Sequence, residues 1–286
     1  MTDTLWTLWN VSPWLQAGWI CLGFTLCTWL LSVITREYSW VDRMWSVAPP
    51  IYALWVAGSA GFGDARLNLM AVLITLWGAR LTFNFARKGG YWKGGEDYRW
   101  AILQERMTPW QFQLFNATFI SPFQMGLVYL FTSPLHLAWQ GRGTALTIWD
   151  GALAAGFLSL LIIETIADEQ MWAFQQDKKR RLAQGQPVTQ PFFNRGLYRL
   201  SRHPNYFGEV GQWWVLVGFG IVATGTWLTW TWAGPVVLTV LFAGSIRFAE
   251  SISASKYPTY RDYQRTTSMV APWFPGRAPA ADRVEG

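Results

Sequence analysis

Seven apolar runs alternate with short polar segments along the chain, and each run is long enough to form one membrane-spanning helix. A helix rises about 1.5 Å per residue, and the hydrocarbon core of a bilayer is roughly 30 Å thick. The pattern therefore predicts an all-α integral membrane protein, a bundle of seven transmembrane helices. Pro49, Pro50 and Pro122 predict kinks in the second and fourth helices, because proline lacks a backbone N–H. The predicted spans are Trp14–Ile34, Trp40–Ala60, Leu67–Ala86, Phe112–Leu135, Ile148–Ala167, Phe207–Ala223 and Trp227–Phe248.

Positive charge falls almost entirely on one side of this arrangement. Of the 23 Lys and Arg residues, only Arg66 and Arg142 lie in loops on the opposite side, and Arg80 lies inside the third span. Basic residues concentrate in cytoplasmic loops of membrane proteins, so we expect the N-terminus outside and the C-terminus in the cytoplasm. The net charge of +6 then follows from topology and does not predict a nucleic-acid partner.

The stretch Asn194–Glu209, NRGLYRLSRHPNYFGE, concentrates polar side chains just before the sixth apolar run. Pro204 suits the first turn of a helix, and the guanidinium groups of Arg199 and Arg202 near a helix N-terminus favour phosphate. Asn205 and Glu209 are four residues apart, so they share a helix face that suits an amide or a ribose. The alternative is a capped helix start with basic side chains that reach toward water. The number of different polar groups favours an anionic ligand at the membrane surface.

Two other predicted cytoplasmic segments add polar groups. Glu164 and Asp168, four residues apart at the end of the fifth span, share a helix face, and a carboxylate inside a membrane helix is costly. Asp168 also fits a solvated helix end. The segment RKGGYWKGGEDYRW has glycines but no P-loop Lys–Ser/Thr pair, so a surface turn and a functional loop are equally compatible with it.

The C-terminal segment after the last span interleaves cations and aromatic rings, including Lys256, Tyr257 and Arg261. Such a surface suits an adenine ring and a ribose phosphate, although an amphipathic helix on the membrane surface has the same composition. Together with the Asn194–Glu209 stretch, it suggests a dinucleotide. No GxGxxG or GxSxG motif occurs, and two His and two Cys residues give no metal-binding pattern.

The motif GLYRLSRHPNYFGE, with Glu164 and Asp168 upstream and KYPTYRDYQRTTSMVAPWFP downstream, resembles bacterial membrane proteins related to steroid 5-alpha-reductases. WVDRMW and the segment with WGARL and GEDYRW extend the resemblance over residues 36–275. It implies a reductase that binds NADPH from the cytoplasmic side of a bacterial inner membrane and reduces a lipophilic, steroid-like enone. The expected protein is a monomer without metal or nucleic acid, with one domain over residues 1–275 (cofactor half about 148–275) and a flexible tail at 276–286.

The resemblance also assigns residues. Those expected at the cofactor are Arg80, Arg87, Arg99, Glu164, Asp168, Arg195, Arg199, Arg202, His203, Asn205, Tyr206, Glu209, Lys256, Tyr257 and Arg261. Glu209 is also expected at the nicotinamide end, in the catalytic set. Reductases of this kind polarise the substrate carbonyl with a Tyr and a Glu from the second and third helices. Here Asp42, Tyr91 and Tyr98 are the candidates, and Asn84 occupies the region where the Tyr is expected.

A second family offers an alternative. Isoprenylcysteine and phospholipid methyltransferases, which use S-adenosylmethionine, share an RHPxY element followed by a hydrophobic span. They usually have paired glutamates shortly before the terminal aromatic and basic motif, whereas RFAESISASKYP contains Glu250 alone. The long SRHPNYFGE match and Asp168 favour the reductase. A non-catalytic membrane scaffold is a third reading, in which the polar cluster only anchors the chain.

Overall fold

The structure, a computed structural model, describes residues 12–188 and 190–276, and this part of the chain is helical without β-strands. The chain divides into two compact units. Unit 1 comprises Met1–Leu158 and Trp213–Leu238, and unit 2 comprises Ser159–Gln212 and Thr239–Gly286. The helices α10 (Ile148–Ala183), α11 (Pro204–Thr224) and α12 (Ala233–Lys256) each contribute residues to both units.

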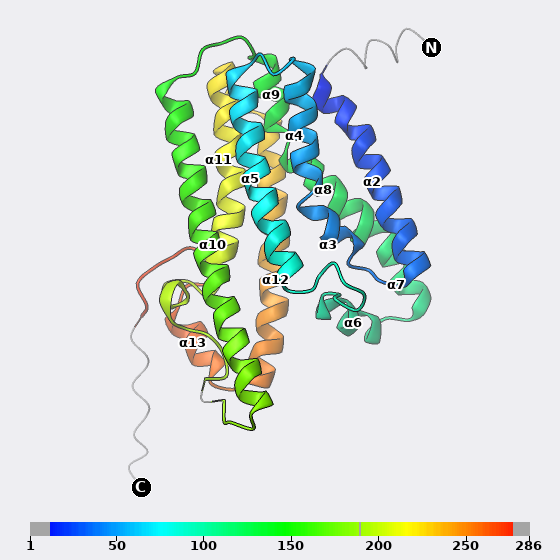
Figure 1. Cartoon of the computed structure of the whole chain (residues 1–286), viewed down its shortest axis with the longest axis vertical. Coiled ribbons are helices and arrows are strands. Elements are labelled where there is room, and N and C mark those ends of the chain that lie inside the picture. Colours follow the sequence, from blue (N-terminus) through cyan, green and yellow to red (C-terminus); the bar gives the residue numbers. More distant parts are fainter. Residues whose placement is uncertain (1–11, 189, 277–286) are drawn as a thin grey trace. The chain divides into compact units, whose positions relative to one another are not determined.

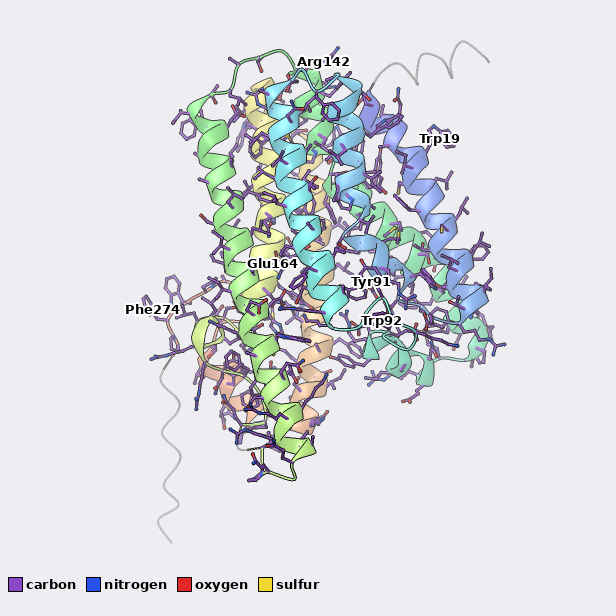
Figure 2. All side chains as sticks on the ribbon, viewed as in Figure 1. Trp19, Tyr91, Trp92, Arg142, Glu164 and Phe274 are labelled. Atoms are coloured by element: carbon purple, nitrogen blue, oxygen red, sulfur yellow. The ribbon has the colours of Figure 1, made fainter. Side chains whose placement is uncertain are left out.

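Unit 1 is built on three helices in which α4 (Ala48–Ser59) lies between α2 (Pro13–Thr35) and α5 (Ala65–Arg87) (Figure 1). Its buried aromatic core joins Trp77, Phe131 and Trp213, with Trp213 edge-on to Trp77 at 4.8 Å between ring centroids. Large apolar side chains on the outer face of α2 stay exposed, and Trp19 points away from the other helices with 61% of its surface exposed (Figure 2). Such a face suits contact with lipid.

The second predicted span is two helices in the structure. α3 (Trp40–Trp45) ends before α4 begins, and Pro49 and Pro50 lie in the first turn of α4, where a missing N–H costs no helical hydrogen bond. α4 is therefore only 12 residues long. The loop after α5 leads into the short helices α6 (Tyr98–Glu105) and α7 (Pro109–Phe115).

The fourth predicted span is interrupted around Pro122. The π-helical segment η1 (Asn116–Phe123) separates α7 from α8 (Gln124–Phe131), and α9 (Pro134–Gln140) follows. A wider turn accommodates the proline ring and its missing donor, as expected for a proline inside a helix. The predicted irregularity at Pro122 is therefore confirmed.

Among the described residues, five helical regions are long and apolar enough to cross a membrane: Pro13–Thr35, Ala65–Arg87, Pro109–Gln140, Ile148–Ala183 and Trp230–Lys256. The class of helical membrane protein is thus supported. Neither α4 nor α11 is among these five, so the number of seven spans and their orientation stay predictions. α10 continues to Ala183 instead of ending at Ala167, where the predicted span ends. Residues 168–183 are more polar than the span, but they contain no Gly or Pro that would end the helix.

Unit 2 contains the C-terminal parts of α10 and α12, the first turns of α11 and the elements that connect them. The 3₁₀ turn η2 (Gly196–Arg199) precedes α11, and α13 (Tyr260–Thr266) follows α12. Phe192 packs on Tyr260 and Tyr263 of α13, which holds the connection after α10 against the C-terminal segment. The remaining short element, η3 (Trp230–Trp232), lies in unit 1 before α12.

Candidate functional site

The start of α11 is fixed by the segment that follows α13. The Arg202 N–H donates to the Ser268 carbonyl at 2.8 Å, and the Ser201 hydroxyl donates to the Val270 carbonyl at 2.7 Å. The His203 N–H in turn donates to the Ser201 oxygen at 3.1 Å. Pro204 begins α11, as the sequence predicts. The hydrogen bonds that hold the turn before the helix do not need an N–H from Pro204, so the proline does not disturb them.

Glu250 of α12 is the shared acceptor of this region. Arg202 donates from Nε to Oε1 at 2.6 Å and from Nη2 to Oε2 at 3.1 Å, a bidentate pair in which both side chains are less than 10% exposed. His203 Nε2 lies 2.9 Å from Oε1, and the Gln264 amide donates to Oε2 at 2.8 Å. Arg202 Nη1 donates to the carbonyls of Gln264 and Thr267. All three guanidinium nitrogens of Arg202 are therefore engaged within the protein.

A second buried polar group joins α10 and α11. Glu164, Asp168 and Glu209 are at most 5% exposed, and Gln212 is fully buried. The Gln212 amide nitrogen donates to Glu164 Oε2 at 2.7 Å and to the Gly208 carbonyl at 3.0 Å. Its oxygen Oε1 has no hydrogen-bond partner within the described residues. Figure 2 labels Glu164, which lies on α10.

Gly208 allows this close approach of the two helices. A β-carbon at this position would lie 2.7 Å from the Glu164 β-carbon and 2.7 Å from the Leu160 carbonyl oxygen. Only a residue without a side chain fits there, so the backbone of α11 can bring Gln212 to Glu164.

Asn205 and Tyr206, which lie between these two groups along the chain, complete the polar region of unit 2. The Tyr206 ring stacks on His203 at 5.5 Å between centroids and packs against Phe242 at 4.8 Å. Asn205 is half-buried, and among the described residues its side-chain amide makes no hydrogen bond. The Asn205 amide, which has both a donor and an acceptor, is therefore compatible with a ligand that forms hydrogen bonds of both kinds.

Four of the predicted cofactor cations are exposed in unit 2: Arg195, Arg199, Lys256 and Arg261. Tyr257 differs from them, because Lys178 donates to its hydroxyl at 3.1 Å and lies 5.2 Å from its ring centroid. The hydrogen bond from Lys178 lowers the pKa of Tyr257. Lys178 also donates to the Pro191 carbonyl at 2.9 Å, so the Lys178–Tyr257 pair anchors the connection after α10.

The candidates of unit 1 gather around the loop between α5 and α6, where Figure 2 labels Tyr91 and Trp92. The Asp42 carboxylate accepts from the Trp100 indole at 3.0 Å. The Tyr91 hydroxyl donates to the Arg43 carbonyl at 3.2 Å. Tyr98 is 55% exposed, and partial burial raises the pKa of its phenol.

This loop is held to the segment before α3 by several hydrogen bonds. Glu96 accepts from the backbone N–H groups of Tyr38 and Ser39, and Arg43 donates to the Gly90 carbonyl at 3.0 Å and to Glu37 at 2.9 Å. These bonds constrain the backbone of the glycine-rich segment. They do not assign a ligand to it, so a surface turn and a functional loop are both compatible with them.

The predicted cofactor arginines of unit 1 have partners on their own segments. Arg99 forms an ion pair with Asp97 at 2.7 Å, and Arg87 donates to Asn84 at 3.0 and 2.8 Å. Arg80 lies on α5. The structure thus brings the unit 2 candidates together around α11, whereas Asp42, Tyr91, Tyr98 and these arginines belong to unit 1.

Sequence reasoning missed two residues at the centre of the site, Glu250 and Gln212. Glu250 entered the sequence analysis only as the single glutamate that argues against a methyltransferase. Gln212 lies in the apolar run of α11, where an isolated amide is a signal because an unpaired polar side chain is costly inside a membrane.

An all-helical membrane protein with a buried polar site at the start of α11 is the class that these observations define. Within that class, the chain belongs to the family described as protein of unknown function (DUF1295), whose profile matches residues 28–267. This family is linked to steroid 5-alpha-reductase-like proteins.

The chain is also similar to a relative from Schizosaccharomyces pombe, "Uncharacterized protein C594.04c". The two are 35% identical over 283 residues, which covers 93% of this chain and 82% of the relative. That relative is a yeast protein, so the similarity is not evidence for the predicted bacterial group. No solved structure gives a significant match.

Proposed function

We propose that this protein is an NADPH-dependent membrane reductase that reduces an activated C=C bond of a lipophilic enone, in particular a 3-oxo-Δ4-steroid-like substrate. The observation that supports this proposal best is the buried set of Glu164, Asp168, Glu209 and Gln212 on α10 and α11, next to the unused amide of Asn205. Buried carboxylates in a membrane helix are costly unless they have a task.

The polar groups of unit 2 fit the parts of such a cofactor. The unpaired Gln212 oxygen and the Asn205 amide suit the N–H and C=O groups of a carboxamide, and the buried carboxylates suit the hydroxyl groups of a ribose. The exposed guanidinium groups of Arg199 and Arg261 suit phosphate. Arg202 fits this role less well than the sequence predicts, since Glu250 and two carbonyls already engage its guanidinium.

The proposed reduction requires a hydrogen-bond donor at the carbonyl oxygen of the enone. The bound reduced nicotinamide would supply the hydride that the β-carbon of the substrate accepts. In the chain, a hydrogen-bond donor stabilises the negative charge that develops on the carbonyl oxygen, and solvent protonates the α-carbon. Of the unit 1 candidates Asp42, Tyr91 and Tyr98, the Tyr98 hydroxyl makes no hydrogen bond to a described residue and so keeps a proton to donate.

The apolar helices support a location in the membrane. We further propose a cytoplasmic opening of the site, because most of the basic residues of unit 2 lie in segments that the charge pattern places on that side. We also propose that the protein lies in a bacterial inner membrane and is a monomer.

The test is ligand binding to the detergent-purified protein. NADPH binding, followed by energy transfer from the 21 tryptophans, is expected to weaken about tenfold or more in Asn205→Ala and Glu209→Gln, because each loses a buried hydrogen bond. Glu105→Gln, at an exposed position of α6, is the matched control. Oxidation of NADPH with a 3-oxo-Δ4-steroid then tests the reaction. Binding of S-adenosylmethionine without NADPH binding would replace the reductase with a methyltransferase.

A further inference from the structure

The hydrogen bond between Glu250 and His203 assigns different roles to the two ring nitrogens of His203. An ionised carboxylate only accepts hydrogen bonds, and the bidentate contact with Arg202 favours the ionised form of Glu250. His203 Nε2, 2.9 Å from Glu250 Oε1, must therefore carry a proton. In a neutral ring Nδ1 is then an acceptor, and in the imidazolium it is a second donor.

His203 Nδ1 is the open end of this chain of contacts. Among the described residues no hydrogen bond reaches Nδ1, although only 18% of the side chain is exposed. The ring plane is held from one side by the stacked ring of Tyr206, and Glu250 fixes its rotation. A histidine oriented by a carboxylate in this way presents one defined nitrogen to a ligand.

Arg202 has the opposite arrangement. Its Nε and Nη2 face Glu250, and its Nη1 donates to the carbonyls of Gln264 and Thr267, which follow α12 in the chain. Truncation of this guanidinium would remove its hydrogen bonds to α13 and to Thr267, while the bonds from the Arg202 N–H and the Ser201 hydroxyl to the following segment would remain. The two neighbouring basic residues of the RHP motif therefore share Glu250, but Arg202 has all its guanidinium nitrogens engaged, whereas His203 keeps Nδ1 without a hydrogen bond among the described residues.

We propose that Glu250 is a positioning residue of the cofactor site, which holds His203 with Nδ1 directed to a phosphate of the ligand and holds Arg202 on the α13 segment. The identity of the ligand rests on the function proposed above, whereas the orientation of His203 does not. As the imidazolium, His203 then contributes the N–H of Nδ1 to the anion, whereas the Arg202 guanidinium stays bound to Glu250 and to the carbonyls of Gln264 and Thr267. Glu250 thus acts on the ligand through His203.

Two substitutions of His203 separate ligand binding from structure. The amide of Asn lies near the position of Nδ1, and the amide of Gln lies near that of Nε2. His203→Asn is expected to keep NADPH affinity within about threefold, and His203→Gln to lose about tenfold or more, because only Asn retains a donor toward the ligand. His203→Gln should unfold at the higher temperature of the two, since it keeps a contact with Glu250. If Gln preserves both binding and stability better than Asn, His203 has only a structural role and the proposal fails.

Ring-nitrogen NMR of the ligand-free protein tests the orientation without a cofactor. The chain has two histidines, so spectra of ¹⁵N-histidine protein with a His136→Gln variant assign His203. We expect a proton on Nε2 in the unmodified protein, and loss of this preference in Glu250→Gln but not in Glu105→Gln. A neutral ring protonated at Nδ1, or a spectrum unchanged by Glu250→Gln, would overturn the inference. Absence of NADPH binding alone would instead reject the proposed reductase and leave this result standing.

Discussion

The described part of each unit contains a deeply buried arginine–carboxylate pair, and these two pairs differ in what surrounds them. In unit 1, Arg66 and Asp150 form a bidentate contact at 2.7 and 3.0 Å, with both side chains 1% exposed. Thr144 and the Ala145 carbonyl accept the other donors of Arg66, and Thr147 donates to Asp150 through its N–H and hydroxyl. Every group in this cluster has a partner from the protein.

The pair in unit 2 has the same geometry but includes a histidine with one nitrogen open. Arg202 and Glu250 meet at 2.6 and 3.1 Å, and His203 shares the carboxylate. In unit 1 the buried ion pair joins two helix ends, whereas in unit 2 the pair also holds His203, the residue that we propose contacts the ligand. The surroundings of the pair decide between these roles, since the pair itself is alike in both units.

The largest expected effect is on the closed pair of unit 1. Asp150→Asn leaves the Arg66 charge buried without its counter-ion, which should lower the free energy of unfolding by about 3–5 kcal/mol. Unfolding in detergent measures this loss, and NADPH affinity of the folded fraction should not change. Asp177→Asn, which breaks exposed pairs with Arg180 and Arg181, is the control and should leave stability unchanged. A stable Asp150→Asn variant would show that the unit 1 pair is not a structural link.

A smaller effect is expected where a helix glycine permits close packing, and each unit again offers one example. A β-carbon on Gly78 would lie 2.5 Å from Pro50, and one on Gly208 would lie 2.7 Å from Glu164. Both alanine variants should lose about 1–3 kcal/mol of stability, because the neighbouring helix must move.

Only Gly208→Ala should also weaken NADPH binding, because it displaces Glu164 from Gln212. Gly151→Ala, with no atom within 4 Å of its added carbon, controls for helix propensity. Equal loss of NADPH affinity in Gly78→Ala and Gly208→Ala would remove the distinction between the two units.

The smallest expected effect concerns a third pair, Arg43 and Glu37 at 2.9 Å. The Gly94 N–H, followed by Arg43, lowers the pKa of Glu37. The ionised form therefore adds stability above the ordinary carboxyl pKa of about 4.3, and this stability is lost as the pH falls through the folded-state pKa. Glu37→Gln should cost about 1 kcal/mol or less at pH 7, because an amide oxygen still accepts from Arg43 and the Gly94 N–H and only the charge is lost. The stability difference between the two proteins should shrink as the pH falls below the ordinary carboxyl pKa, and a difference that does not change with pH would exclude the ion pair as its source.

The hydrophobic pattern was sufficient to predict the bounds of those helices whose ends depend on nearby residues. α2 and α5 begin and end within a few residues of the predicted spans, and α11 begins at Pro204. The pattern was less reliable where polar residues continue a helix. The sequence analysis ended the fifth span at Ala167, whereas the helix continues to Ala183, because helix formation requires neither apolar side chains nor a membrane where no Gly or Pro intervenes.

The sequence by itself determined the helical membrane class, the effect of the prolines on helix starts and interruptions, and the concentration of polar residues before α11. These features depend on composition and on neighbours along the chain. Only the tertiary structure decided that Arg66 meets Asp150 and that Arg202 and His203 share Glu250, at separations of 84, 48 and 47 residues. Many carboxylates along the chain offer a basic residue the same charge. The packing of helices selects one of them, since a buried ion pair forms only where both side chains leave water together.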